Sequence, residues 1–260
     1  MTQTKTTATN YTLAELMVVT AAREIHDNEV VYVGMRLPLL AFLMAKNLHA
    51  PDAVGFYENG LIRETPASEL LFTMGDPPNI LGATQAGDML NVMGMLQSGR
   101  VDIGFLGAGE VDRFGNLNST AVHKADGSLV RLPGSGGAAD IASLAKRTVM
   151  LMEHSRNRLP ERVSYLTSPG NGNGSGWRKE VGLQRGGPSC LITTMGVFRF
   201  DNQDASARLE SIHPGVGSQR LQDETGWDVQ ISDSIQTTPE PTAAELELIR
   251  RIDPERFWTA

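Results

Sequence analysis

A carboxylate stands between an apolar run and a turn signal in the stretch Gly55-Phe56-Tyr57-Glu58-Asn59-Gly60-Leu61. Asn-Gly is typical of tight turns because both residues tolerate positive φ. We therefore expect Glu58 where a strand ends in a turn. A carboxylate that is oriented and poorly hydrated can attack an activated acyl group as a nucleophile. Taken alone, however, a Glu before Asn-Gly is more often a solvated turn residue.

A glycine-rich turn offers a second kind of chemistry. It consists of Gly134, Ser135, Gly136, Gly137 and Ala138. Together with Ala139 it gives the pattern G-x-G-x-x-A, which matches the dinucleotide fingerprint, and Glu153 follows at about the 20 residues expected of a ribose-binding acid. Pro133 directly before the turn, and a position past the middle of the chain, argue against a nucleotide site. The turn either presents backbone N–H groups to an oxyanion of acyl chemistry or simply packs a helix on a sheet.

A third candidate carboxylate, Glu110, lies in a loop of residues 107–119. The loop contains a turn at 112–115, and Asn116 and Asn118 supply amides that can fasten loop backbone. A structural role is the simpler interpretation of the loop as a whole. We retain Glu110 as a candidate substrate-binding group.

The spacing does not support serine, zinc or thiol chemistry. Ser135, Ser175 and Ser189 each lack a flanking glycine of the G-x-S-x-G elbow. The five histidines show neither i,i+4 pairing nor H-E-x-x-H, so we predict no metal site. The single cysteine, Cys190, lies in an apparent strand and is expected to be a small buried hydrophobic residue.

The periodicity of apolar residues predicts the scaffold that positions these groups. Helices are expected at residues 12–25, 37–50, 86–99 and 138–147, and strands at 29–34, 52–57, 101–111, 127–133 and 148–153. Thr12 and Glu15 form a capping-box pattern at the start of the first helix, and Gly99 closes the third. Strands that alternate with helices indicate an α/β fold with an open, mostly parallel sheet and helices on both faces. Residues 63–84, which contain three prolines, are expected to be irregular.

The pattern changes after about residue 160. Shorter strands are expected at 162–168, 189–200 and 207–214, which indicates a C-terminal antiparallel annex. The segment around 168–180 is so rich in glycine that we do not expect it to be rigid. With no repeat and no long linker, residues 1–260 are expected to form a single domain.

The composition excludes several classes of protein. The chain has 260 residues, a net charge of −7 and a pI of about 5.3, which argues against a general nucleic-acid surface. The polar N-terminal residues lack the apolar core of a signal peptide, and no run approaches the ~20 apolar residues of a membrane span. One cysteine allows no disulfide framework, so a reducing, cytoplasmic location is expected.

Several motifs together resemble the class I coenzyme A transferases, and most closely the B-type chain of the glutaconate CoA-transferase type. The motifs are YENGL, GAGEVDRFGNLNST, LPGSGGAADIAS, TSPG and TGWDVQIS, and the resemblance runs from NYTLAELMVVTAAREI to RRIDPERF. The resemblance implies that Glu58 is the nucleophile, with Asn59 and Gly60 beside it. It also implies that the N–H of Gly136 helps to form an oxyanion hole, within a binding segment that runs from Gly134 to Ala138.

The resemblance further implies one component of a hetero-oligomeric enzyme that moves CoA between carboxylic acids through a glutamyl-CoA thioester. The family's glycine-rich CoA-binding segment has no counterpart here, so a separate A-type partner chain is implied. Coenzyme A is then a substrate and covalent intermediate, with acyl-CoA and carboxylic acids as the other substrates. No permanently bound cofactor is expected.

Two rivals remain. Relatives on the same scaffold hydrolyse a carbon–carbon bond in CoA-linked ring fragments or decarboxylate a CoA thioester, but they lack the glutamate of the E-N-G or E-S-G segment. The presence of Glu58 therefore favours transfer. The other rival is a non-catalytic ligand-sensing domain, which would bind a ligand without turnover.

Overall fold

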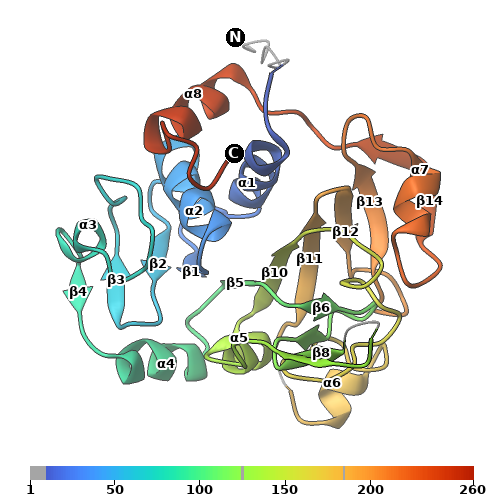
Figure 1. Cartoon of the computed structure of the whole chain (residues 1–260). Coiled ribbons are helices and arrows are strands. Elements are labelled where there is room, and N and C mark those ends of the chain that lie inside the picture. The colour runs from blue at the N-terminus through green and yellow to red at the C-terminus, as the bar shows by residue number, and fades with distance from the viewer. Residues whose placement is uncertain (1–9, 124–125, 184) are drawn as a thin grey trace. The chain divides into compact units, whose positions relative to one another are not determined.

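The computed structural model describes residues 10–123, 126–183 and 185–260, and the chain divides into two compact units. Unit 1 contains the residues up to Met95 together with Pro239–Ala260, and unit 2 contains Leu96–Thr238. Unit 1 is therefore made from two separate stretches of the chain, which Figure 1 colours blue to green and red. The single domain expected over residues 1–260 stays a prediction.

Unit 1 combines a small mixed sheet with helices. Its elements are α1 (Leu13–Arg23), β1 (Val30–Tyr32), α2 (Leu37–Leu48), β2 (Val54–Phe56), β3 (Leu61–Arg63), α3 (Pro77–Ile80), β4 (Gln85–Ala86), most of α4 (Met89–Gln97) and α8 (Ala243–Ile252). The strands follow the order β1-β2-β3-β4, parallel in the first pair and antiparallel in the other two. Helix α2 is apolar almost all round and is buried from Pro38 to Lys46, as expected of a core helix.

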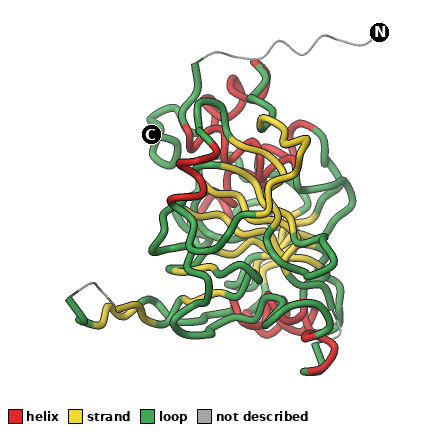
Figure 2. The backbone as a smooth tube through the Cα atoms, turned by 90° about the vertical axis from the view of Figure 1, so that its right-hand side faces the viewer, coloured by secondary structure: helices red, strands yellow, loops and turns green. Residues whose placement is uncertain are grey.

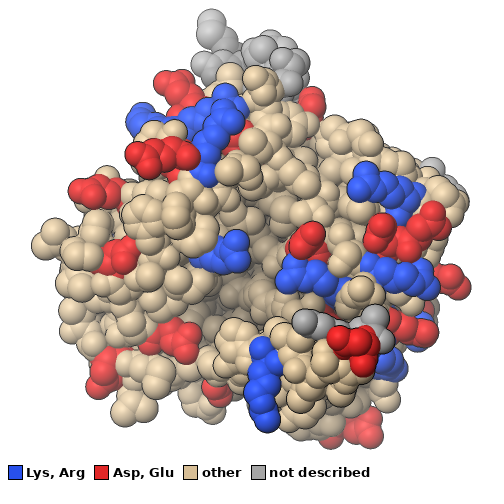
Figure 3. All heavy atoms as spheres, viewed as in Figure 1, with Lys and Arg blue, Asp and Glu red and all other residues tan. Residues whose placement is uncertain are grey.

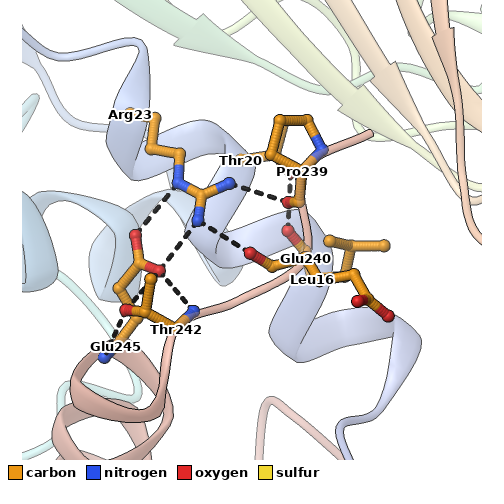
Figure 4. A network of polar contacts seen from close by, with 7 residues as sticks. All are labelled: Leu16, Thr20, Arg23, Pro239, Glu240, Thr242 and Glu245. Atoms are coloured by element: carbon orange, nitrogen blue, oxygen red, sulfur yellow. Dashed lines mark hydrogen bonds and ion pairs between the residues drawn. The ribbon is translucent and has the colours of Figure 1, made fainter. Parts of the chain in front are cut away.

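Helix α8 returns from the far end of the chain to pack on α1 and α2. Figure 4 shows the Arg23 guanidinium of α1 facing both oxygens of Glu245, at 3.0 and 2.8 Å, and the carbonyls of Pro239 and Glu240. On α1, the buried Glu15 accepts from Arg250 of α8 at 2.8 Å. The predicted capping box at the start of α1 is confirmed, and α8 begins with a second one that the sequence analysis did not predict.

Unit 2 is built around strands in the order β14-β13-β12-β11-β10-β5. Its elements are β5 (Ile103–Leu106), β6 (Glu110–Val111), β7 (Leu117–Asn118), β8 (Ala121–His123), β9 (Leu129–Arg131), α5 (Ala138–Leu144), β10 (Arg147–Met152), α6 (Trp177–Glu180), β11 (Pro188–Thr193), β12 (Gly196–Arg199), β13 (Arg208–Ile212), α7 (Ser218–Asp223) and β14 (Gln230–Thr237). Pairs β5–β10 and β10–β11 are parallel, β11–β12 and β12–β13 are antiparallel, and β13–β14 is parallel. The open α/β sheet with antiparallel strands in the C-terminal part is thus confirmed.

Two small ribbons, β6–β7 and β8–β9, stand outside these strands. Figure 2 shows the β8–β9 ribbon projecting from the rest of unit 2. The sequence analysis placed β9 in the main sheet because a local pattern predicts that a strand exists but not which strand it pairs with. Register and pairing depend on long-range contacts, which periodicity does not report.

Two expectations for unit 2 are wrong. Residues 162–168 form no strand, and only Ser168 makes an isolated bridge, to Leu117. The glycine-rich segment is not loose either, because Asn116 accepts from the N–H groups of Gly170 and Gly172 at 2.9 and 3.1 Å. Glycine there permits a close approach, since a Cβ at Gly172 would lie 1.9 Å from the Trp177 ring.

Candidate active site

Glu58 lies at the first central position of a tight turn between β2 and β3. The N–H of Gly60 donates to the carbonyl of Tyr57 at 2.9 Å, and the N–H of Tyr57 donates to Leu61 at 2.9 Å. Gly60 alone adopts positive φ, +97°, so the turn is the three-residue hairpin type and not the type in which Asn59 would also turn left-handed. The predicted turn at the end of a strand is confirmed, and Glu58 is partly exposed on it.

The Glu58 turn is held by a buried aromatic side chain and by neighbouring backbone. Tyr57 is buried and meets the Phe42 ring edge-on, with centroids 6.4 Å apart. The Asn59 amide donates to the carbonyl of Met74 at 2.9 Å, so that side chain braces the turn. A Cβ at Gly60 would lie 2.5 Å from the Asp88 backbone, which leaves room for glycine only. The turn therefore has little freedom to move within unit 1.

A buried arginine that the sequence analysis missed fixes the irregular segment that follows β3. Arg63, 2% exposed at the end of β3, donates to five backbone carbonyls between 2.6 and 3.2 Å. The acceptors are Thr65, Pro66, Pro78, Asn79 and Leu81. An irregular segment leaves carbonyls without ladder partners, and the guanidinium supplies donors for them. A single arginine ending an apolar strand just before a proline-rich segment was the signal in the sequence.

The glycine-rich turn of residues 134–138 follows β9 and precedes α5 in unit 2. Gly134 and Gly136 adopt φ of +95° and +48°, so both glycines are required by the backbone. The N–H of Gly134 donates to Ser119 at 2.7 Å, and the N–H of Ala138 donates to the carbonyl of Ser135 at 2.9 Å. Gly137 caps α5 with no side-chain bond. These contacts fasten the turn to the loop of residues 107–119.

The turn does not have the setting of a dinucleotide site. That fingerprint needs a sheet strand leading directly into the turn and helix, whereas β9 pairs only with β8. Glu153, the expected ribose partner, is paired with Arg158 at 3.0 Å. The geometry agrees with the arguments from the sequence against NAD. It also corrects the expectation that this turn lies at the end of a strand of the main sheet.

Glu110 is embedded in the loop it begins. Its Oε2 accepts from the Asn118 amide and from both the N–H and the hydroxyl of Ser164, each at 2.8 Å, and the residue is 8% exposed. Nearby, burial raises the pKa of Asp112, which also accepts from the Asn116 amide at 3.0 Å. The predicted fastening role of the two asparagines is confirmed. A ligand-binding role for Glu110 stays a prediction.

The cysteine and the histidines considered in the sequence analysis do not form a second candidate site within the described residues. Cys190 is buried in β11, as expected. Across residues 10–123, 126–183 and 185–260, no group of three or more His, Cys, Asp or Glu side chains could hold a metal ion. Burial lowers the pKa of His154 and of His213 to about 4 each, so both rings are neutral at pH 7. No helix in the described part of the chain is long and apolar enough to cross a membrane.

The chain is similar to known coenzyme A transferases over almost its whole length. Residues 14–223 match the family model described as coenzyme A transferase. The chain is 35% identical to the B-type chain of the 3-oxoadipate CoA-transferase of Pseudomonas knackmussii, over 94% of each chain. It is 32% identical to the B-type chain of the glutaconate CoA-transferase of Acidaminococcus fermentans, over 95% of this chain and 94% of that one.

Solved structures and one further relative extend the comparison. The structure of the Acidaminococcus fermentans glutaconate CoA-transferase superposes with a TM-score of 0.88 at 30% identity, over 97% of this chain and 98% of that one. The decarboxylase AibA/AibB superposes with a TM-score of 0.81 at 29% identity, over 96% and 98%. The cholesterol ring-cleaving hydrolase IpdB subunit of Mycobacterium tuberculosis is 30% identical, over 86% and 84%.

Proposed function

The chain belongs to the coenzyme A transferase family as a B-type component, and on that premise we propose that Glu58 is the nucleophile through which CoA moves between two carboxylic acids. The observation that carries the proposal is the Glu58 turn. Glu58 is partly exposed at the first central position of the hairpin turn. The preceding Tyr57 is buried, and Gly60 packs against the backbone of Asp88, so the turn is fixed in position. A nucleophile needs this combination of access and fixed position.

Each half of the reaction needs only a carboxylate and two acyl transfers. Glu58 attacks the carbonyl carbon of the donor thioester, the C–S bond of the thioester breaks, and CoA thiolate leaves, so that an acyl-glutamyl anhydride remains. The thiolate then attacks the glutamyl carbonyl, which releases the first acid as its carboxylate and leaves a Glu58–CoA thioester. A second carboxylate reverses both steps, so that acceptor acyl-CoA forms and the Glu58 carboxylate returns. Each step conserves charge and needs no redox partner.

The turn of residues 134–138 is assigned to the oxyanions of these steps. Tetrahedral intermediates at a thioester or anhydride carry negative charge on oxygen, and backbone N–H donors stabilise that charge. We assign this donor to Gly136, with Ser135 and Gly137 beside it. The positive φ of Gly136 supports the assignment, because a side chain there would strain the backbone and move its N–H.

The names of the relatives support a hetero-oligomer with an A-type companion, which would bring the cationic contacts for the CoA phosphates. Acyl-CoA thioesters and free carboxylic acids are the substrates, coenzyme A is the covalent intermediate, and no resident cofactor takes part. We expect the enzyme in the cytoplasm, where acyl-CoA is metabolised.

Trapping the intermediate tests the role of Glu58. Incubation of the assembled complex with donor acyl-CoA and no acceptor should add the mass of CoA to the peptide that contains Glu58, because the thioester persists until a carboxylate arrives. Borohydride should reduce this thioester to an alcohol and inactivate the enzyme. Glu58→Gln should abolish the adduct and transfer while folding and assembly survive. Glu64→Gln, an exposed glutamate at the end of the same hairpin, is the matched control and should retain both.

The second candidate is hydrolysis or decarboxylation on the same scaffold, which the similarity to AibA/AibB and to the ring-cleaving hydrolase favours. The two are separated by the need for an acceptor. Turnover of acyl-CoA that is independent of any added carboxylate, together with near wild-type activity of Glu58→Gln, would replace the transferase proposal by this one.

A further inference from the structure

Residues 118–120 hold the chain at the entrance to the glycine-rich turn, and we call them the 118–120 strap. The N–H of Gly134 donates to the carbonyl of Ser119 at 2.7 Å. Two residues earlier, the N–H of Leu132 donates to the carbonyl of Thr120 at 2.9 Å. The strap and the turn both belong to unit 2. These two bonds therefore set the position from which the chain enters the turn.

The hydroxyl of Thr167 is bonded to the same strap. Its Oγ1 accepts from the N–H of Ser119 at 3.0 Å and is hydrogen-bonded to the hydroxyl of Thr120 at 2.8 Å. Ser119 thereby connects Thr167 to Gly134, since its N–H donates to the hydroxyl and its carbonyl accepts from the turn. If the hydroxyl is lost, the backbone of Ser119 can shift, and the acceptor of the Gly134 N–H shifts with it.

Asn118 anchors the strap separately, so the effect of Thr167 is local. The buried Asn118 amide donates to Glu110 Oε2 at 2.8 Å, and its Oδ1 accepts from the N–H of Thr120 at 3.0 Å. The Thr167 hydroxyl reaches this Oδ1 only at 3.5 Å. The bonds of Asn118 should therefore persist when the Thr167 hydroxyl is removed. The hydroxyl acts instead on Ser119, the residue to which the turn is bonded.

The glycine-rich turn can offer an anion backbone donors but no cation. Residues 132–139 contain no Lys, Arg or His. Over the face of unit 2 in Figure 3, Lys and Arg side chains are interspersed with Asp and Glu. An oxyanion at the turn would therefore depend on the direction of N–H groups and not on an excess of positive charge. Because such a donor must point at the developing charge, small displacements of the turn should reduce the stabilisation.

We infer that Thr167 is a positioning residue of the transfer reaction: through Ser119, its hydroxyl fixes the glycine-rich turn and so the direction of the N–H of Gly136. The inference rests on the proposed function for the role of the turn. It deepens that proposal, because it names a side chain outside the turn on which the stabilisation of the oxyanions depends. It also assigns a role to the first residue of the TSPG motif.

Two variants of Thr167 test the inference in the assembled complex. Thr167→Val removes the hydroxyl at nearly constant volume and should lower kcat about tenfold, which is less than the roughly 10²–10³-fold cost of losing an oxyanion donor outright. The KM for acyl-CoA should stay unchanged, since the lost interaction matters only in the transition state. Thr167→Ser keeps the hydroxyl and should retain the wild-type kcat.

Thr225→Val is the matched control, which separates positioning from stability. The Thr225 hydroxyl is buried in unit 2, donates to the carbonyl of Leu221 at 2.7 Å and is bonded to His154 Nε2 at 3.0 Å. Its removal should lower the free energy of unfolding in urea at least as much as removal of the Thr167 hydroxyl. It should leave kcat unchanged, because these bonds lead to α7 and to His154 and not to the strap.

Amide hydrogen exchange gives a readout that does not depend on activity. In Thr167→Val, exchange in the peptide of residues 132–136 should become about fivefold to tenfold faster, as expected for the loss of one net hydrogen bond. It should be unchanged in Thr167→Ser and in Thr225→Val. Unchanged exchange in Thr167→Val would overturn the inference. Faster exchange with a wild-type kcat would also overturn it.

Gly136→Ala separates this inference from the proposed function. If Gly136→Ala transfers CoA at the wild-type rate, the assignment of the oxyanion donor in the proposed function is wrong. Faster exchange and a lower kcat in Thr167→Val would then still support the positioning role, through another N–H of the turn. If Gly136→Ala loses transfer and Thr167→Val keeps the wild-type kcat, the proposed function stands and the positioning role of Thr167 is wrong.

Discussion

Replacement of Gly60 by alanine should disable the enzyme by moving Glu58 and not by removing any functional group. Gly60 has φ of +97°, where an L side chain is strained by roughly 1–2 kcal/mol. Its Cβ would also lie 2.5 to 2.6 Å from three backbone atoms of Asp88. Since carbon atoms pack at about 3.5 Å or more, the hairpin and the Asp88 backbone must separate by roughly 1 Å.

The control is Gly215→Ala. Gly215 has a similar φ of +80°, but a Cβ there meets no heavy atom within 4 Å. Both variants should therefore carry the left-handed strain, and only Gly60→Ala should carry the clash, which adds about 1–3 kcal/mol. A displacement of about 1 Å in a catalytic group costs roughly 10²-fold in rate. We therefore expect transfer to fall by about 10²-fold in Gly60→Ala and to be unchanged in Gly215→Ala.

Two measurements on each variant decide the outcome: urea unfolding, and steady-state transfer in the assembled complex with the companion saturating. The trapped CoA adduct should form more slowly in Gly60→Ala, in step with transfer. If Gly60→Ala is destabilised no more than Gly215→Ala and transfers CoA at the wild-type rate, then the position of Glu58 does not depend on this turn and our account of the site is wrong.

Three further predictions concern buried polar groups. The folded pKa values of His154 and His213, about 4, lie below the ordinary 6.5, so the unfolded chain binds the extra protons between those values. The contribution of each histidine to the free energy of unfolding is therefore complete above pH 6.5 and should fall by about 3 kcal/mol as the pH drops to 4. Equal free energies of unfolding at pH 7 and pH 5 would contradict this. Arg63→Lys cannot serve five carbonyls, so it should cost about 3 kcal/mol and open residues 64–82 to limited proteolysis, while exposed Arg100→Lys should do neither. Glu110→Gln should lower the unfolding free energy by about 1–3 kcal/mol, because Gln cannot accept all three bonds, and should leave the KM for acyl-CoA unchanged; a raised KM at unchanged stability would instead make Glu110 a ligand-binding residue.

The parts of the fold that the sequence predicts well are those fixed by local chemistry. The capping box at Thr12 and Glu15 starts α1, and Gly60 and Gly99 take positive φ at a turn and after a helix end. The Glu58 turn was found because Asn-Gly is a short-range signal. The two asparagines at 116 and 118 were interpreted correctly because amides in loops have few other uses.

The parts that failed depend on partners far away in the chain. Nothing local tells whether β9 pairs with a sheet or only with β8, or that residues 162–168 pass by as a loop held to Glu110 and Asp112. Arg63 was missed because its five acceptors are backbone carbonyls, which leave no pattern in side-chain types, so that the position of Arg63 at the end of an apolar strand was the only signal. Likewise, Leu81 and Leu90 are visible in the sequence as apolar residues, but only the structure shows that they are exposed.

The assembly of unit 1 from both chain ends sets an order of maturation. Residues 96–238 are synthesised before α8, whereas α1 and α2 must wait for α8 to cover them. Until then the pairs of Arg23 with Glu245 and of Glu15 with Arg250 do not exist. The unit that bears Glu58 is therefore the second of the two to be completed during synthesis, although its first strands and helices are made before unit 2.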